Sequence, residues 1–216
     1  NQLGCLDREQ LKWLEETLAE VGDKLVLVTI HHNVIEHIPG QSRHELGKRY
    51  MLDNAIELLE ILKTYGVKLI FSGHLHVQDL VEADGIYEIT TGSLVSYPHP
   101  YRVVEFKTNN RQQQELKINS YRVKNVPGWD DLAETSREVM GDRSYPFMLK
   151  LLTSHPVNLP IAQAEKLAPQ LRYFWADIAA GDTLFDFPDL PLSARNYLQK
   201  FGAIAADGTP AAIDNH

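Results

Sequence analysis

Histidines gather at two points of the sequence, each directly after a run of apolar residues. His31 and His32 follow the first run, and His74 and His76 follow the second, with Gly73 just ahead of them. One histidine beside a strand is usually an ordinary polar residue, but two clusters that meet can bind a metal ion. In extended backbone the two imidazoles of His-x-His point to the same side, and Gly73 permits the backbone turn. Imidazole suits zinc, iron, manganese and copper, so the pattern predicts a transition-metal site.

Phosphoester hydrolysis is a reaction that such a site can support. Two ions about 4 Å apart lower the pKa of a bridging water and clamp the phosphoryl oxygens. A pair of ions also needs a bridging carboxylate, and no Asp or Glu stands in an obvious ligand position beside the histidines. Asp53 and Asp79 are the nearest candidates.

The elements that must position these histidines alternate between helix and strand. Residues 8–21 and 51–64 have apolar side chains at helical spacing, and Gly follows each segment. Residues 25–30 and 67–71 are apolar runs that predict strands buried on both faces, and we expect the first to be central. Alternation of this kind predicts a layered α/β domain. Loops at the carboxyl ends of neighbouring strands converge, so the histidine clusters should meet.

The chain changes character twice after the second histidine cluster. Shorter strands are expected at residues 85–90, 101–107 and 115–123. Helices are expected near residues 130–140, 146–153, 161–180, with a bend at Pro169, and 193–201. We therefore predict three parts: an α/β part over residues 1–123, a small helical domain over residues 124–202, and a loose tail over residues 203–216.

The segment from Gly4 to Lys107 resembles the C-terminal half of the catalytic domain of calcineurin-like metallophosphoesterases. The matching residues are the helix positions Gln10, Trp13 and Leu14, a V-x-x-H element ending at His31, and the G-H-x-H signature Gly73, His74, Leu75, His76. The resemblance implies an α/β fold, namely the C-terminal half of a four-layer αββα sandwich followed by a helical domain.

The resemblance also implies a set of metal ligands. His31 and His74 would ligate the second of two divalent or mixed-valence ions of manganese, iron or zinc, and His76 would belong to the first. The family's D-x-H, G-D and G-N-H-[DE] motifs come earlier in its sequences. We therefore expect this chain to be a fragment that is a poor catalyst by itself, while the whole protein is active.

A further similarity concerns the substrate. Residues 91–102, together with Gln78, are similar to family members that act on cyclic nucleotides, some of which also have a C-terminal helical domain. Tyr97, His99 and Arg102 could stack on a base or contact a phosphate. The alternative, which we favour, is that the two prolines of this stretch shape a loop whose tyrosines are packing residues.

The remaining histidines carry weaker signals. His32 could act on the substrate side of the site or be an ordinary polar residue. Four others fit no ligand spacing and are expected to be structural or exposed: His37, His44, His155 and His216.

Composition limits the partners. The formal charge of −8 would repel bulk nucleic acid, so a small phosphoester is the expected substrate. No run of about 20 apolar residues is present to cross a bilayer, and the single cysteine, Cys5, favours a cytoplasmic location. The oligomeric state stays open. Two alternatives to a phosphodiesterase also stay open: a phosphomonoesterase or nucleotide-sugar hydrolase of the same family, and a non-catalytic metal-binding domain.

Overall fold

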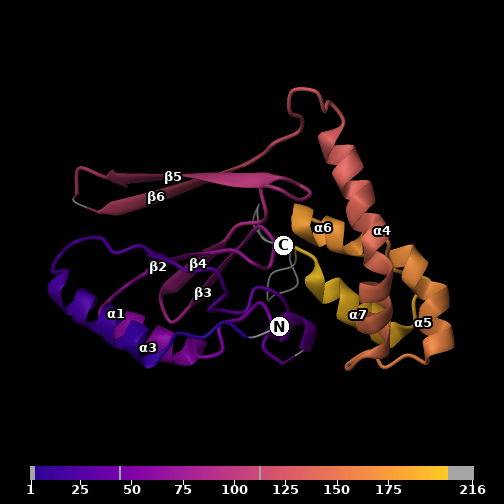
Figure 1. The fold of residues 1–216 in the computed structure, drawn as a ribbon, viewed down its shortest axis with the longest axis horizontal. Coiled ribbons are helices and arrows are strands. Elements are labelled where there is room, and N and C mark those ends of the chain that lie inside the picture. The colour runs from indigo at the N-terminus through magenta and orange to yellow at the C-terminus, as the bar shows by residue number, and fades with distance from the viewer. Residues whose placement is uncertain (1–2, 44, 112, 204–216) are drawn as a thin grey trace.

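The computed structural model describes residues 3–43, 45–111 and 113–203 (Figure 1). The predicted tail beyond residue 203 lies outside these residues, as do His44 and His216. The elements are α1 (Arg8–Glu20), β1 (Val28–Thr29), α2 (Glu45–Lys48), α3 (Ala55–Thr64), β2 (Leu69–Ser72), β3 (Asp79–Ala83), β4 (Ile86–Thr90), β5 (Pro100–Thr108), β6 (Gln114–Arg122), α4 (Leu132–Thr153), α5 (Ile161–Leu167), α6 (Phe174–Ala180) and α7 (Leu192–Leu198), with short 3₁₀ turns at Ala168–Leu171 and Gln199–Phe201.

The first helix begins at a complete capping box. The Asp7 carboxylate accepts the backbone N–H of Gln10 at 2.8 Å, and the Gln10 side chain accepts the N–H of Asp7 at 2.9 Å. Two N–H groups that have no partner inside the helix are satisfied in this way. The helix predicted at residues 8–21 is confirmed, while the one predicted at 51–64 begins later, at Ala55.

Four strands form a sheet in the order β1-β2-β4-β3. β1, β2 and β4 are parallel, and β3 pairs with β4 in the antiparallel sense. The prediction that residues 25–30 form a central strand buried on both faces is wrong. Within the described part of the chain β1 pairs only with β2, and Leu25 and Leu27 are 49% and 42% exposed. The run alternates, because Val26, Val28 and Ile30 pack partly against the core while the residues between them face outward.

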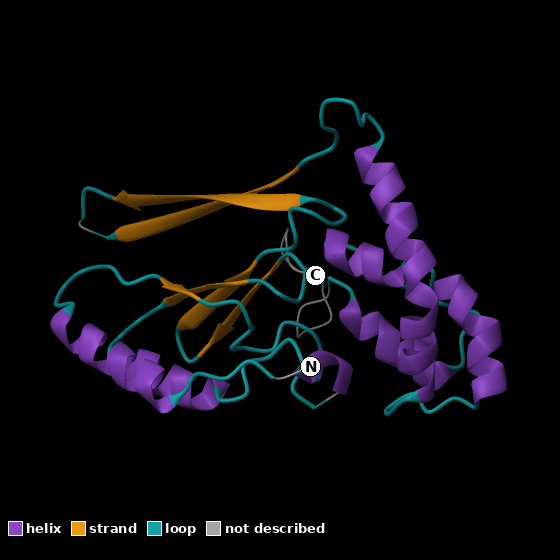
Figure 2. Ribbon diagram, viewed as in Figure 1, coloured by secondary structure: helices purple, strands orange, loops and turns teal. Residues whose placement is uncertain are grey.

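Helices α1 and α3 cover one face of this sheet (Figures 1 and 2). Leu18 from α1 and Leu58 and Leu62 from α3 pack against Ile70 of β2 and Ile86 of β4 in one apolar cluster. The β5–β6 hairpin lies on the opposite side of the sheet in both figures. The predicted α/β class is confirmed at this level, and the four-layer sandwich stays an expectation from the resemblance.

The helices from α4 onward gather at one end of the sheet (Figure 1). The apolar cluster of these helices includes Leu75 and Val77. The helices therefore pack directly on the loop after β2, which carries the second histidine cluster. The two helices predicted at residues 130–140 and 146–153 are a single helix, α4, which continues through Pro146. No helix in the described ranges is long and apolar enough to cross a membrane.

Candidate functional site

The pairing of β1 with β2 brings the two histidine clusters together. Val28 pairs with Ile70 and Thr29 with Phe71, so both strands end at the same edge of the sheet. Just beyond this edge the N–H of Gly73 donates to the carbonyl of His31 at 3.3 Å. The carboxyl ends of parallel neighbours converge, as in other layered α/β folds.

The imidazoles lie in contact with one another. His31 Nε2 is 2.9 Å from His74 Nδ1, and the ring centres of His32 and His74 are 4.6 Å apart. His74 and His76 both have a φ of 61°, in the left-handed region that non-glycine residues rarely occupy. Such conformations cost on the order of 1–3 kcal/mol each and concentrate at functional sites.

A cavity of about 550 Å³ opens over these rings, and we call it the histidine cavity. Its lining residues are His31, His32, Arg49, Tyr50, His74, Leu75, His76 and Trp175. None of these is an Asp or Glu. Burial, followed by repulsion from neighbouring histidines, lowers the pKa of His32, His74 and His76. Neutral imidazole is the form that binds a metal ion.

The donors fit a transition metal in type, and one pair of ring nitrogens lies close together. His31 Nε2 and His74 Nδ1 are 2.9 Å apart and share a hydrogen bond. Two nitrogens at about 2.1 Å from a tetrahedral ion would be about 3.4 Å apart, so a small movement of the rings would let both bind one ion in place of this hydrogen bond. Within the described residues, however, no three His, Cys, Asp or Glu side chains are placed to hold one ion. His76 is exposed and lines the same cavity as the pair.

A comparison with known protein families gives a match, and it covers the part of the chain that carries the histidines. Residues 1–78 match the calcineurin-like phosphoesterase model. The matched segment contains all four histidines of the cavity, and it ends two residues after His76. No curated protein matches the chain.

A buried polar network supports the loop that follows His31. The Glu88 carboxylate accepts the backbone N–H groups of Val34 and Ile35 at 3.0 and 2.6 Å and lies 3.3 Å from the Asn33 amide nitrogen. Asn33 also donates to Ser72 Oγ at 3.0 Å. The network therefore ties the loop after His31 to β2, the strand that leads to His74.

His37 lies inside this network, with its side chain fully buried. Its Nδ1 is 2.8 Å from Asp79 Oδ2, and its Nε2 is 3.4 Å from Glu88 Oε1. Burial opposes a charge on the ring, but the contacts with both carboxylates outweigh it and raise the pKa of His37. Asp79 is thus held by His37, and Asp53 is exposed. Neither of the two carboxylates considered as metal ligands lines the histidine cavity.

The substrate residues suggested by the sequence lie outside the histidine cavity. His99 has both ring nitrogens engaged, with the Leu94 carbonyl at 3.1 Å and Ser136 Oγ at 2.8 Å. Arg102 donates to the carbonyls of Asp79 and Thr90 at 3.1 and 2.9 Å, so it fastens the β5–β6 hairpin to the sheet. Tyr97 and His99 line a neighbouring cavity. Of the suggested residues, the structure joins only His32 to the three proposed ligands.

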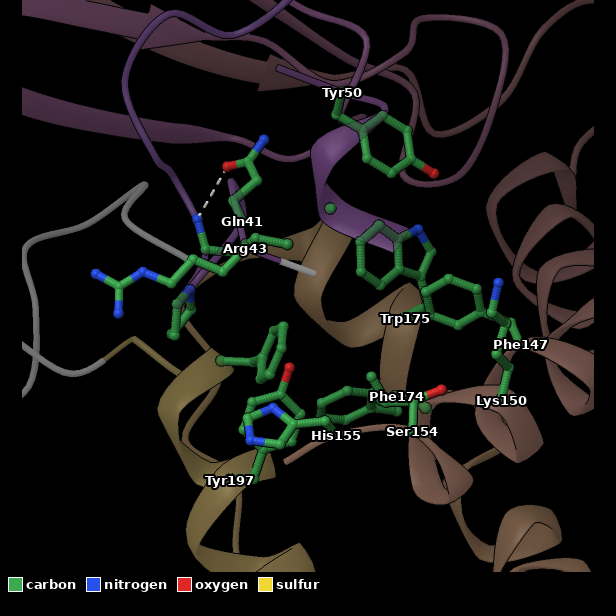
Figure 3. A pocket seen from close by; sticks show the side chains of 15 residues that line it. Gln41, Arg43, Tyr50, Phe147, Lys150, Ser154, His155, Phe174, Trp175 and Tyr197 are labelled. Carbon is green, nitrogen blue, oxygen red and sulfur yellow. Dashed lines mark hydrogen bonds between the residues drawn. The ribbon is translucent and has the colours of Figure 1, made fainter. Parts of the chain in front are cut away.

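Three lining residues were missed by the sequence reasoning: Arg49, Tyr50 and Trp175. Tyr50 and Trp175 also line two further cavities, one of them a cavity of about 480 Å³ between the loop after His37 and the helices (Figure 3). In Figure 3 the Trp175 ring lies between those of Tyr50 and Phe147. Trp175 comes from α6, about 100 residues after His76 in the sequence. Its place in the cavity lining is therefore visible only in the folded chain.

Proposed function

We propose that this chain carries the histidine half of a metal-dependent phosphoester hydrolase, with His31, His74 and His76 as metal ligands. The observation that carries the proposal is the 2.9 Å approach of His31 Nε2 to His74 Nδ1 at the end of two parallel strands, within the segment that matches calcineurin-like phosphoesterases.

The electrostatics of the histidine cavity support an anionic substrate. The chain as a whole has a formal charge of −8, yet the lining of this cavity includes Arg49 and, among the described residues, no carboxylate. A guanidinium presents paired N–H donors that match phosphate oxygens. Bound ions would add charge neutralisation and a water of lowered pKa. Arg49 would hold the phosphoryl group over the imidazoles, and Tyr50 and Trp175 would limit access of bulk water.

The finer proposal is a phosphodiesterase with a dinuclear centre that acts on a small diester such as a cyclic nucleotide. The size of the histidine cavity, about 550 Å³, suits such a substrate and supports it. A cytoplasmic location is proposed with it, on the presence of a single cysteine.

The test is metal content together with hydrolysis of bis(p-nitrophenyl) phosphate, in the protein that carries this chain at its natural length. We expect about two ions per chain, and loss of both metal and hydrolysis in a His31→Ala, His74→Ala variant. His155→Ala is the matched control, because His155 is exposed and does not line the histidine cavity. Retained hydrolysis in the double variant would refute the proposal.

One rival function has an observation in its favour. The described lining offers imidazoles without a carboxylate, which also fits a single structural ion. A non-catalytic domain would bind one ion per chain and hydrolyse neither bis(p-nitrophenyl) phosphate nor p-nitrophenyl phosphate. A marked preference for the second compound would indicate a phosphomonoesterase instead.

A further inference from the structure

A second cavity, which we call the aromatic cavity, adjoins the histidine cavity. It has a volume of about 630 Å³ and shares Arg49, Tyr50 and Trp175 with the histidine cavity. The same three side chains therefore form the boundary between the two cavities. Small-molecule sites in proteins are usually of about 300–1,000 Å³ and mostly apolar.

Aromatic rings make up much of the lining of the aromatic cavity. Tyr97 comes from the loop before β5, Trp129 precedes α4, Phe147 lies on α4, and Trp175 lies on α6. Trp129 is 44% exposed, so it does not serve as a core residue. Large rings held partly open to solvent at a cavity favour the stacking of a planar group.

The polar groups of the aromatic cavity favour an anion. Its lining includes Arg49 and Arg143 and, among the residues that the structure describes, no Asp or Glu. Two buried polar atoms on lining residues, Arg49 Nε and Ser96 Oγ, have no hydrogen-bond partner within the described chain. A buried polar atom without a partner is costly and calls for an explanation. Contact with the polar atoms of a bound molecule would supply one.

The guanidinium of Arg49 is placed at the boundary of the two cavities. Its carbon lies 4.7 Å from the centre of the Tyr50 ring, and one of its terminal nitrogens donates to the Tyr50 hydroxyl. The contact with Tyr50 fixes the orientation of the fork, so that its remaining donors can contact a phosphate oxygen at little entropic cost.

We propose that the aromatic cavity binds the planar aromatic group of a phosphoester, of nucleoside size, while Arg49 contacts a phosphate oxygen over the histidines. The phosphate part of this assignment rests on the proposed function. The stacking part rests on the lining of the aromatic cavity itself. It predicts that phosphoesters with an aromatic group bind more tightly than sugar phosphates or polyphosphates. Trp129 is the stacking residue whose loss should matter most, because it is the most exposed of the four rings.

The test is calorimetric titration of the metal-free protein with adenosine 5′-monophosphate and with ribose 5-phosphate, which differ by the base. Stacking is worth about 1–3 kcal/mol per base, so we expect the first ligand to bind about tenfold or more tightly. Trp129→Ala should remove this preference and leave ribose 5-phosphate binding unchanged. Arg49→Gln should weaken both ligands. Trp13→Ala and Arg8→Gln, both at exposed positions of α1, are the controls.

Equal binding of the two ligands, or a Trp129→Ala variant with unchanged preference, would overturn the inference. If the base preference disappears in Trp129→Ala but the intact protein hydrolyses no phosphoester, then the aromatic cavity stands and the proposed function fails. If hydrolysis depends on His74 but no base preference exists, then the proposed function stands and this inference fails. Circular dichroism of each variant checks that the loss of binding does not come from unfolding.

Discussion

Glu88 is the residue whose removal should most clearly connect stability with the histidine site. Its buried carboxylate accepts the N–H groups of Val34 and Ile35, contacts the Asn33 amide, and lies 3.4 Å from His37. Burial would raise the pKa of Glu88, but His37 and the hydrogen-bond donors outweigh this and lower the pKa, so the group is charged. Glu88→Ala leaves several buried donors without their acceptor and removes one of the two carboxylates beside His37.

The loss in free energy of unfolding expected for Glu88→Ala can be estimated in two ways. Each orphaned buried donor costs about 1–3 kcal/mol, and removal of one member of a buried ion pair costs about 3–5 kcal/mol. Because the two estimates describe the same contacts, we expect a total near 4 kcal/mol and not their sum. The free energy of unfolding of a protein is typically about 5–15 kcal/mol, so the variant should still fold at low temperature.

Urea unfolding of Glu88→Ala beside Glu60→Ala measures this loss. Glu60 is exposed on α3, and its removal should change stability by about 0.5 kcal/mol or less. Because the network holds the loop after His31, Glu88→Ala should also weaken metal binding in the folded protein. A stability loss no larger than that of the control would refute the role assigned to the network.

Other outcomes follow from single residues. The pKa of His37 is raised above its ordinary value of 6.5. At pH values between 6.5 and the folded pKa, the folded chain therefore binds more protons than the unfolded chain. The stabilisation from His37 is therefore complete below pH 6.5 and lost as the pH rises through the folded pKa, and the stability gap to His37→Gln, measured by urea unfolding, should shrink with pH. Arg102→Ala should cost about 2–4 kcal/mol through lost hydrogen bonds, yet leave the KM for bis(p-nitrophenyl) phosphate unchanged, whereas a raised KM would restore a substrate role. A Cβ at Gly4 would come within 2.4 Å of His32 Nδ1. Gly4→Ala should thus shift the ring resonances of His32, and an unchanged spectrum would contradict the close packing.

Local signals carried much of the fold. The helical spacing of apolar residues in 8–21 predicted α1 correctly. Strand β3 was missed, although Asp84–Gly85, with φ values of 52° and 79°, is the kind of pair that closes a tight hairpin. The buried position of Asp79 at the start of β3 depends on His37, and a charged residue at a buried strand end cannot be told from a loop residue without its partner.

The edge position of β1 could not be predicted from the sequence, for a different reason. An uncharged apolar run fits a strand buried on both faces as well as one that alternates, and sheet order decides between them. The same limit applied to the site. Spacing revealed the histidines because they follow strands, but Arg49, Tyr50 and Trp175 reach the cavity through loop and helix packing that leaves no periodic signal.

The helices bear on the histidine site through shared packing as well as through Trp175. Leu75 and Val77, on either side of His76, are buried in the same cluster as Met148 and Leu152 of α4. The backbone of His76 is thereby fixed in its left-handed conformation by neighbours that belong to the helical part of the chain. Strained conformations persist only where surrounding contacts over-determine them. Packing of α4 against the loop of residues 73–76 is therefore part of what holds His74 and His76, the proposed ligands, in their observed conformations.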